Sequence, residues 1–213
     1  MKKIQRVSPV VLKGTPVKTK NIDNWEIVME YEGEGNGPYL IDLTHKQRFD
    51  LQDSNLAGQK PFQITMPEMP GHSVLDKGIL SNRMNNTQAS IYNLGAENIA
   101  MPEDSGFTDV TESTLFVALI GENIFSICEK LTSLDFMDPD KKAPFLFQGP
   151  FSHVPCQIVT LSKNLENPGL VLTCSRGYGR DMINAVIDAG KEFGLQSAGE
   201  EQFNNFIKKQ INF

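Results

Sequence analysis

The sequence has few residues that could cross-link the chain or bind a metal ion. Only three of its 213 residues are cysteines, and only three are histidines. Cys128, Cys156 and Cys174 lie far apart, and their odd number and wide spacing match neither a zinc site nor a disulfide framework. We therefore predict no metal site and three reduced thiols, mostly buried because cysteine is among the most buried residue types.

Long apolar runs and an excess of positive charge are missing as well. The longest apolar run, LFVALI (115–120), is too short to cross a bilayer. No apolar stretch of signal-peptide length follows the charged start, MKKIQRVSPVVLKG. The formal net charge is −6, the isoelectric point is about 5.1, and no basic face is evident. These absences predict a cytoplasmic protein that binds neither a membrane nor nucleic acid.

Signatures of common catalytic sites are also missing. The chain has no phosphate-binding loop, no His-Glu-x-x-His, no Cys-x-x-Cys and no Gly-x-Ser-x-Gly. The segment GYGRD (177–181) lacks the spacing of a dinucleotide-binding fingerprint. No residue is therefore predicted to be catalytic.

The composition that remains is that of an ordinary soluble globular protein, with 39% hydrophobic and 22% charged residues. The length fits one large domain or two small interlocked ones, and it suffices to bury a core without disulfides.

Apolar periodicity predicts both strands and helices. Residues 25–31 (WEIVMEY) alternate as in a half-buried strand. Further strands are expected at 39–43, 48–52, 88–94 and 113–120, and an antiparallel hairpin at 156–163 and 169–176. Helices are expected at 122–134, 179–194 and 199–213, while 56–78, 96–106 and 144–155 are interpreted as loops or turn-rich segments.

These elements do not alternate regularly between strand and helix. The order predicts an α+β fold with mixed, mainly antiparallel sheets and flanking helices, rather than a doubly wound parallel sheet. We expect two interlocked α+β lobes, formed by residues 1–110 and 111–213.

The three histidines are the first candidates for a functional site. His45 could act as a general base beside Asp42, or both residues could cap the end of a strand by bonding backbone groups. His72 and His153 are expected to be surface or packing residues.

Two further segments could bind a ligand. In TCSRGYGRD (173–181), Arg176 and Arg180 at a helix N-terminus could bind a carboxylate, and Tyr178 could stack on a flat ring; alternatively, the glycines form a turn and the arginines are solvated. The amides of NRMNNTQASIYN (82–93) could bind the polar edge of a heterocycle or simply form turns.

Three stretches resemble the folate-binding family of the glycine cleavage T-protein (aminomethyltransferase). They are YLIDLTHKQRFDLQ (39–52), TLFVALIGENIFSICEKL (114–131) and SRGYGRDMINAVIDAGKEFGLQSAG (175–199). Within that superfamily the chain is most similar to the sarcosine oxidase gamma subunit family. This likeness rests on the opening RVSPV, on DLTHKQRFDLQ, on GENIFSICEKLTSLDF before a Gly-Pro turn, and on the short length.

The resemblance implies a folate-binding fold that has lost its reactive groups. The family's acidic residue matches Tyr92 and Asn93 here, and neither is an acid. Its pterin-holding glutamate falls near Gly179 and Arg180, and its C-terminal barrel is absent. A vestigial folate pocket would be lined by Tyr92, Asn93, Arg176, Tyr178 and Arg180.

The resemblance implies a noncatalytic gamma-type subunit of a sarcosine oxidase-like complex, acting in oxidative N-demethylation and one-carbon metabolism. Its partners would be flavoprotein subunits of a hetero-oligomeric oxidase or demethylase, with the flavin on those partners. No directly bound cofactor is expected, although tetrahydrofolate is possible. Alternatives are a stand-alone tetrahydrofolate-binding protein, an aminomethyltransferase-like enzyme, or a scaffold in an unrelated complex.

A permanent subunit interface would require a large apolar patch on the isolated chain. Phe145, Phe147, Phe151 and residues 203–213 could contribute to such a patch, or could equally belong to an ordinary core.

Overall fold

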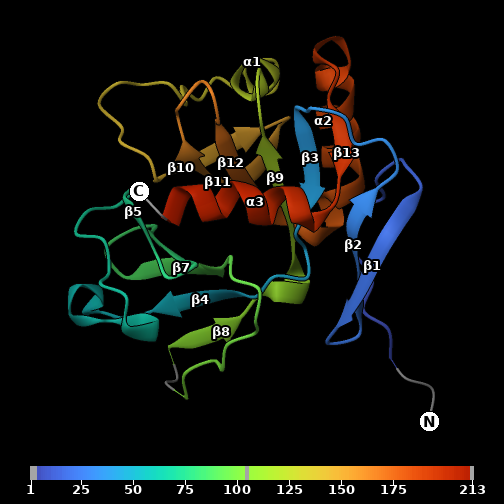
Figure 1. The fold of residues 1–213 in the computed structure, drawn as a ribbon. Helices are drawn as coiled ribbons and strands as arrows, with labels where there is room; N and C mark the ends of the chain where they lie inside the picture. The colour runs from blue at the N-terminus through green and yellow to red at the C-terminus, as the bar shows by residue number, and fades with distance from the viewer. Residues whose placement is uncertain (1–3, 104–105, 212–213) are drawn as a thin grey trace.

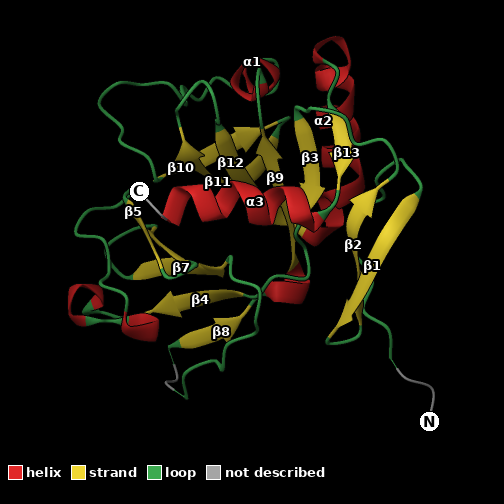
Figure 2. Ribbon diagram, in the orientation of Figure 1, coloured by secondary structure: helices red, strands yellow, loops and turns green. Residues whose placement is uncertain are grey.

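The computed structural model describes residues 4–103 and 106–211, which form the α+β fold expected from the sequence (Figure 1). Its strands are β1 (Pro16–Ile22), β2 (Trp25–Tyr31), β3 (Tyr39–Asp42), β4 (Arg48–Gln52), β5 (Ser73–Asp76), β6 (Ile79–Arg83), β7 (Gln88–Asn93), β8 (Phe107–Asp109), β9 (Thr114–Ile120), β10 (Phe145–Phe151), β11 (Val154–Ser162), β12 (Gly169–Ser175) and β13 (Gln196–Ala198). Its helices are α1 (Ile124–Glu129), α2 (Gly179–Gly190) and α3 (Glu200–Ile211), with short 3₁₀ turns between elements. Figure 2 shows that strands dominate the architecture.

The largest sheet has six strands in the order β10-β11-β12-β9-β3-β13. Neighbouring strands are antiparallel except β13, which pairs in parallel with β3. The prediction of mainly antiparallel pairing, including the β11–β12 hairpin, is therefore confirmed.

Strand β9 is apolar along nearly its whole length because both of its faces are covered. Successive side chains in a strand point to opposite faces. Leu115, Val117 and Leu119 accordingly join the core cluster that contains residues of α1 and α2. Phe116, Ala118 and Ile120 join the cluster that contains residues of α3 and of the second sheet.

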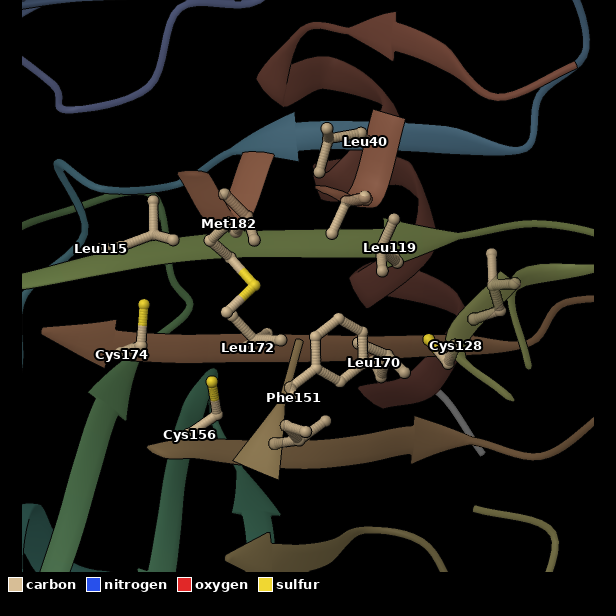
Figure 3. Packing of buried hydrophobic residues seen from close by; sticks show 14 of the residues in the cluster. Leu40, Leu115, Leu119, Cys128, Phe151, Cys156, Leu170, Leu172, Cys174 and Met182 are labelled. Atoms are coloured by element: carbon tan, nitrogen blue, oxygen red, sulfur yellow. The ribbon is translucent and has the colours of Figure 1, made fainter. Parts of the chain in front are cut away.

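Figure 3 shows the first of these clusters, with Met182 of α2 lying over β9 and β12. All three cysteines are free and buried, which confirms the expectation from their spacing. Cys156 of β11 and Cys174 of β12 lie opposite each other on these two neighbouring strands.

The second sheet has five antiparallel strands in the order β5-β6-β7-β4-β8. It encloses its own small core, to which Phe49, Leu51 and Ile91 belong. Leu80, Tyr92 and Leu94 from the same sheet instead pack into the cluster shared with α3 and β9. The two sheets therefore meet along a common seam.

Strands β1 and β2 form a separate two-stranded hairpin. Asp23 and Asn24 form its two-residue turn, and both have positive φ angles (50° and 64°), as in the tight turns that suit twisted hairpins. Strand β1 is exposed along nearly all its length, whereas β2 lies against α3 and β13 (Figure 1).

Several segments differ from the sequence-based expectation. The segment 56–78 is not irregular throughout, because it contains β5, and the turn-rich segment 144–155 contains β10. The helix expected at 122–134 is shorter, since α1 covers only Ile124–Glu129. Within the described residues, no helix is both long and apolar enough to span a membrane.

The expected division into residues 1–110 and 111–213 stays a prediction. The sheets do interlock the two halves, because β3 from the first half lies between β9 and β13 from the second.

Candidate functional site

A cavity of about 260 Å³ lies at the seam between the two larger sheets, and we call it the seam cavity. It draws its walls from β4, β7, β9, β11, β12 and the turn before β9. The lining residues are Arg48, Phe49, Asp50, Gln88, Ser90, Tyr92, Val110, Ser113, Thr114, Gln157 and Thr173. Seven of these eleven residues carry a hydroxyl or an amide side chain, so the cavity offers several neutral hydrogen-bonding groups.

Tyr92 is buried in the wall of the seam cavity. Its hydroxyl donates to Gln157 Oε1 over 2.6 Å and accepts from Ser90 Oγ over 3.2 Å. Burial raises the pKa of Tyr92 to about 12. The phenol therefore stays protonated near neutral pH and serves as a hydrogen-bonding group.

Arg48 is a buried cation at the base of the same cavity. Its Nε donates to Thr114 Oγ1 over 2.8 Å, and its Nη1 donates to the Lys46 carbonyl over 2.6 Å. Other donors reach the carbonyls of Thr44, Thr111 and Thr114. Burial lowers the pKa of Arg48 to about 10, so it remains charged at neutral pH. Its N–H groups donate to acceptors of the chain itself. The side chain therefore stabilises the contact between β4 and the start of β9.

Asp50 is the carboxylate in the wall of the seam cavity. It accepts from the amides of Gln88 (2.8 Å) and Gln52 (3.0 Å). Both of its hydrogen-bonding partners are thus neutral side chains.

Asn93, next to Tyr92 in β7, does not line the seam cavity, because neighbours in a strand face opposite ways. Its Nδ2 donates to Gln47 Oε1 (3.1 Å) and to the Glu97 carbonyl (2.7 Å). Its Oδ1 accepts the Gly95 N–H over 3.0 Å. The amide therefore organises the loop that follows β7.

Arg176, Tyr178 and Arg180 lie where β12 passes into α2, and none of them lines the seam cavity. Arg176 Nη2 donates to the Val7 carbonyl. The N-terminal segment also touches Gly179, where an added Cβ would lie 2.8 Å from Pro9. Of the five residues predicted for a folate pocket, Tyr92 is the one that lines the seam cavity.

Asp42 caps the end of β3, as one of the two sequence interpretations holds. Its Oδ1 accepts the Thr44 N–H over 2.9 Å. His45 instead approaches Glu200, with Nε2 lying 3.2 Å from Oε2. His153 and His72 are exposed, and His72 also packs its ring 5.8 Å from that of Phe145. Both therefore lie where the sequence placed them.

Glu200, at the start of α3, is the centre of a buried charge cluster that the sequence did not reveal. Its Oε1 lies 2.8 Å from Lys46 Nζ, which also donates to the Gly95 carbonyl over 2.9 Å. Burial raises the pKa of Glu200, but the contact with His45 and the charge of Lys46 outweigh it and bring the pKa to about 2. The carboxylate is therefore ionised at every ordinary pH.

Among the residues that the structure describes, no three His, Cys, Asp or Glu side chains gather as a metal site would require. The residues that sequence reasoning missed at the seam cavity include Arg48, Gln157 and Thr173. Arg48 carried no signal of its burial, since its alternation with Phe49 and Leu51 in β4 predicts a position on the polar face.

Comparison with known proteins identifies the fold. No protein-family model and no curated protein sequence matches the chain. Among solved structures, it is similar to a chain of the heterotetrameric sarcosine oxidase from Corynebacterium sp. U-96, solved in complex with pyrrole 2-carboxylate. The TM-score is 0.62, with 13% sequence identity over 72% of this chain and 84% of that one. The protein therefore has a fold related to a sarcosine oxidase chain.

Proposed function

We propose that the protein is a noncatalytic, gamma-type subunit of a hetero-oligomeric complex similar to sarcosine oxidase. The observation that carries this proposal is the shared fold, which extends over most of both chains. The complex would oxidatively demethylate an N-methyl amine on flavoprotein partners and feed one-carbon metabolism, with tetrahydrofolate as acceptor. The membership in the wider aminomethyltransferase superfamily is part of the same proposal.

A noncatalytic role is supported by Tyr92 and Asn93, the residues that match the acidic residue of the aminomethyltransferase superfamily. Tyr92 keeps its proton to a pKa of about 12. Asn93 is committed to the loop after β7 through three hydrogen bonds. Neither residue can take up a proton near neutral pH as a carboxylate base does.

Exposed apolar side chains near the N-terminus support a subunit interface. Val7, Val11 and Tyr178 are 64%, 83% and 48% exposed, and we call them the N-terminal apolar surface. The hydrogen bond from Arg176 to Val7 holds this segment beside the start of α2. Exposed apolar side chains, where they gather on one surface, mark sites of protein association.

Most aromatic residues first considered for this interface belong to the core instead, and Phe145 is partly buried against that core. Phe147, Phe151, Phe203 and Phe206 are 6%, 0%, 0% and 3% exposed. They fill the space on either side of the six-stranded sheet. Residues 212–213 of the same proposed patch lie outside the described residues.

Co-purification tests the proposal. The tagged chain, expressed in its native source, should retain subunits that carry flavin absorbance. Val7→Glu combined with Val11→Glu should abolish that co-purification without unfolding the chain. Leu165→Glu, which alters a side chain that is 74% exposed elsewhere, should leave it intact. Recovery of the chain without any flavoprotein would reject the subunit role.

A second candidate is direct tetrahydrofolate binding, favoured by the position of Tyr92 in the seam cavity. The volume of about 260 Å³ lies just below the range of about 300–1,000 Å³ typical of small-molecule sites. Calorimetry with tetrahydrofolate should give saturable heat that Tyr92→Phe weakens. Absence of heat at high protein concentration would exclude this candidate.

A further inference from the structure

A second cavity, of about 140 Å³, lies between the N-terminal segment, β2 and the end of β3. We call it the N-terminal cavity. Its apolar walls include Val10 and Ile27, and its polar groups include Trp25, Tyr31, Asp42 and His45. It shares no lining residue with the seam cavity.

Trp25 brings an unsatisfied donor to the N-terminal cavity. The residue is only 4% exposed, and its Nε1 has no hydrogen-bond partner among the described residues. A buried donor without an acceptor costs about 1–3 kcal/mol. Buried polar groups are almost always bonded, so this indole N–H calls for an acceptor from outside the chain.

Asp42 brings a carboxylate that forms no direct ion pair, although its negative charge also acts on the buried Arg48. One of its oxygens caps Thr44, and within the described part of the chain no cation lies within ion-pair distance of it. The one basic side chain of the wall, His45, turns its Nε2 to Glu200. The balance of charge therefore favours a cationic occupant.

Tyr31 completes the polar wall. It is 9% exposed, and burial together with the negative charge of Asp42 raises the pKa of its hydroxyl to about 12. The hydroxyl thus remains protonated and can donate or accept a hydrogen bond.

We propose that the N-terminal cavity binds a small amine that also carries a hydrogen-bond acceptor. Asp42 would hold the ammonium group, and Trp25 Nε1 would donate to the acceptor. A cavity of similar volume, about 150 Å³, accommodates benzene in another protein, which limits the ligand to roughly six non-hydrogen atoms. This site goes beyond the subunit role and does not depend on it.

Trp25 makes the test direct, because it is the only tryptophan in the chain. Its fluorescence can be followed while the intact protein is titrated with ethanolamine, with ethylene glycol as the neutral isostere and with glycolate as an anion. Triethanolamine tests the size limit. Ethanolamine should produce a saturable change and bind at least tenfold more tightly than each of the other three compounds.

Variants locate the binding. Asp42→Asn should weaken ethanolamine at least tenfold, whereas Asp50→Asn, in the wall of the seam cavity, should have no effect. Trp25→Phe, followed by calorimetry, should weaken binding at least threefold. If Asp42→Asn does not fold, the relative affinities of the unmodified chain for ethanolamine and ethylene glycol show whether the cavity prefers a cationic ligand. No saturable change would mean that the cavity holds water only, and equal binding of ethylene glycol would mean that the positive charge of the ligand plays no part; either result would overturn the proposal.

Discussion

Glu200 is a buried carboxylate that links two segments far apart in the chain. It joins His45 and Lys46, which follow β3, to the first turn of α3. A carboxylate at a helix N-terminus is also stabilised by the helix dipole. The residue therefore fixes where α3 begins on the body of the protein.

Replacing Glu200 should destabilise the fold strongly. Glu200→Gln leaves Lys46, whose side chain is only 3% exposed, without its carboxylate. Removing one partner of a buried ion pair costs about 3–5 kcal/mol. Urea denaturation should show this loss, while Glu201→Gln, which removes an exposed pair with Lys18, should cost no more than about 1 kcal/mol. Equal effects of the two variants would contradict the structural role of Glu200.

The same residue predicts an acid-dependent loss of stability. The pKa of Glu200 falls from its ordinary value of 4.5 to about 2 on folding. Because the folded pKa is the lower one, the stabilisation is complete above about pH 4.5 and is lost as the pH falls to about 2. The difference corresponds to about 3 kcal/mol. The free energy of unfolding, measured across this interval, should fall less steeply in Glu200→Gln than in the unmodified chain.

The sequence predicted contacts between residues close together in the chain and missed contacts between residues far apart in it. The cap formed by Asp42 depends on a residue two positions away, so a short pattern suffices to predict it. The pairing of His45 with Glu200 joins residues far apart in the chain, and no spacing rule applies to such a pair. Arg48 is buried because a second sheet covers β4, which the alternation within β4 alone cannot show.

Strands with clear apolar alternation were predicted well. The expected strand 25–31 coincides with β2, and 88–94 and 113–120 match β7 and β9 to within a residue. Strand β1 was missed because its outward side chains are mostly polar and it begins with proline. Strands β5 and β6 had a usable signal in the sequence, since Gly78, a residue typical of tight hairpin turns, lies between the apolar pairs Val74-Leu75 and Ile79-Leu80.

Close packing of α3 on β2 depends on one glycine. A Cβ atom at Gly199 would lie 2.1 Å from the backbone carbon of Met29 and 2.4 Å from the backbone nitrogen of Glu30. Backbone atoms cannot move aside as a flexible side chain can. The approach of the helix therefore requires a residue without a side chain.

Gly199→Ala should accordingly separate α3 from β2. Overpacking of this kind typically costs about 1–3 kcal/mol, and sometimes more. Gly177→Ala is the matched control, because nothing lies within 4 Å of its added Cβ, and it should change stability by less than about 0.5 kcal/mol. Thermal melts of the two variants make the comparison, and similar melting temperatures would argue against this packing.

The fold class was predictable for the molecule as a whole, whereas the arrangement of the sheets was not. The irregular order of strands and helices was enough to indicate α+β with antiparallel pairing. The strand order depends on pairings between distant segments, such as β13 with β3. The sequence contains no local pattern that selects them.

Interlocking of the sheets predicts that the chain unfolds as one unit. Strand β3 hydrogen-bonds with β9 and β13, and Leu80 and Tyr92 of the second sheet share a core with α3. Scanning calorimetry should give a single transition whose calorimetric and van't Hoff enthalpies agree. Two resolved transitions would show that the halves 1–110 and 111–213 are independent.

The exposed strand β1 has a consequence for how the protein behaves at high concentration. Its outer side pairs with no other described strand, so its backbone N–H and C=O groups are free to hydrogen-bond with a neighbouring molecule. Lys20 lies on this strand and has no ion-pair partner among the described residues, and charged lysines on an edge strand are a common protection against edge-to-edge aggregation. Electrostatic repulsion between copies would thus keep the molecules apart in storage, and high salt should promote their precipitation.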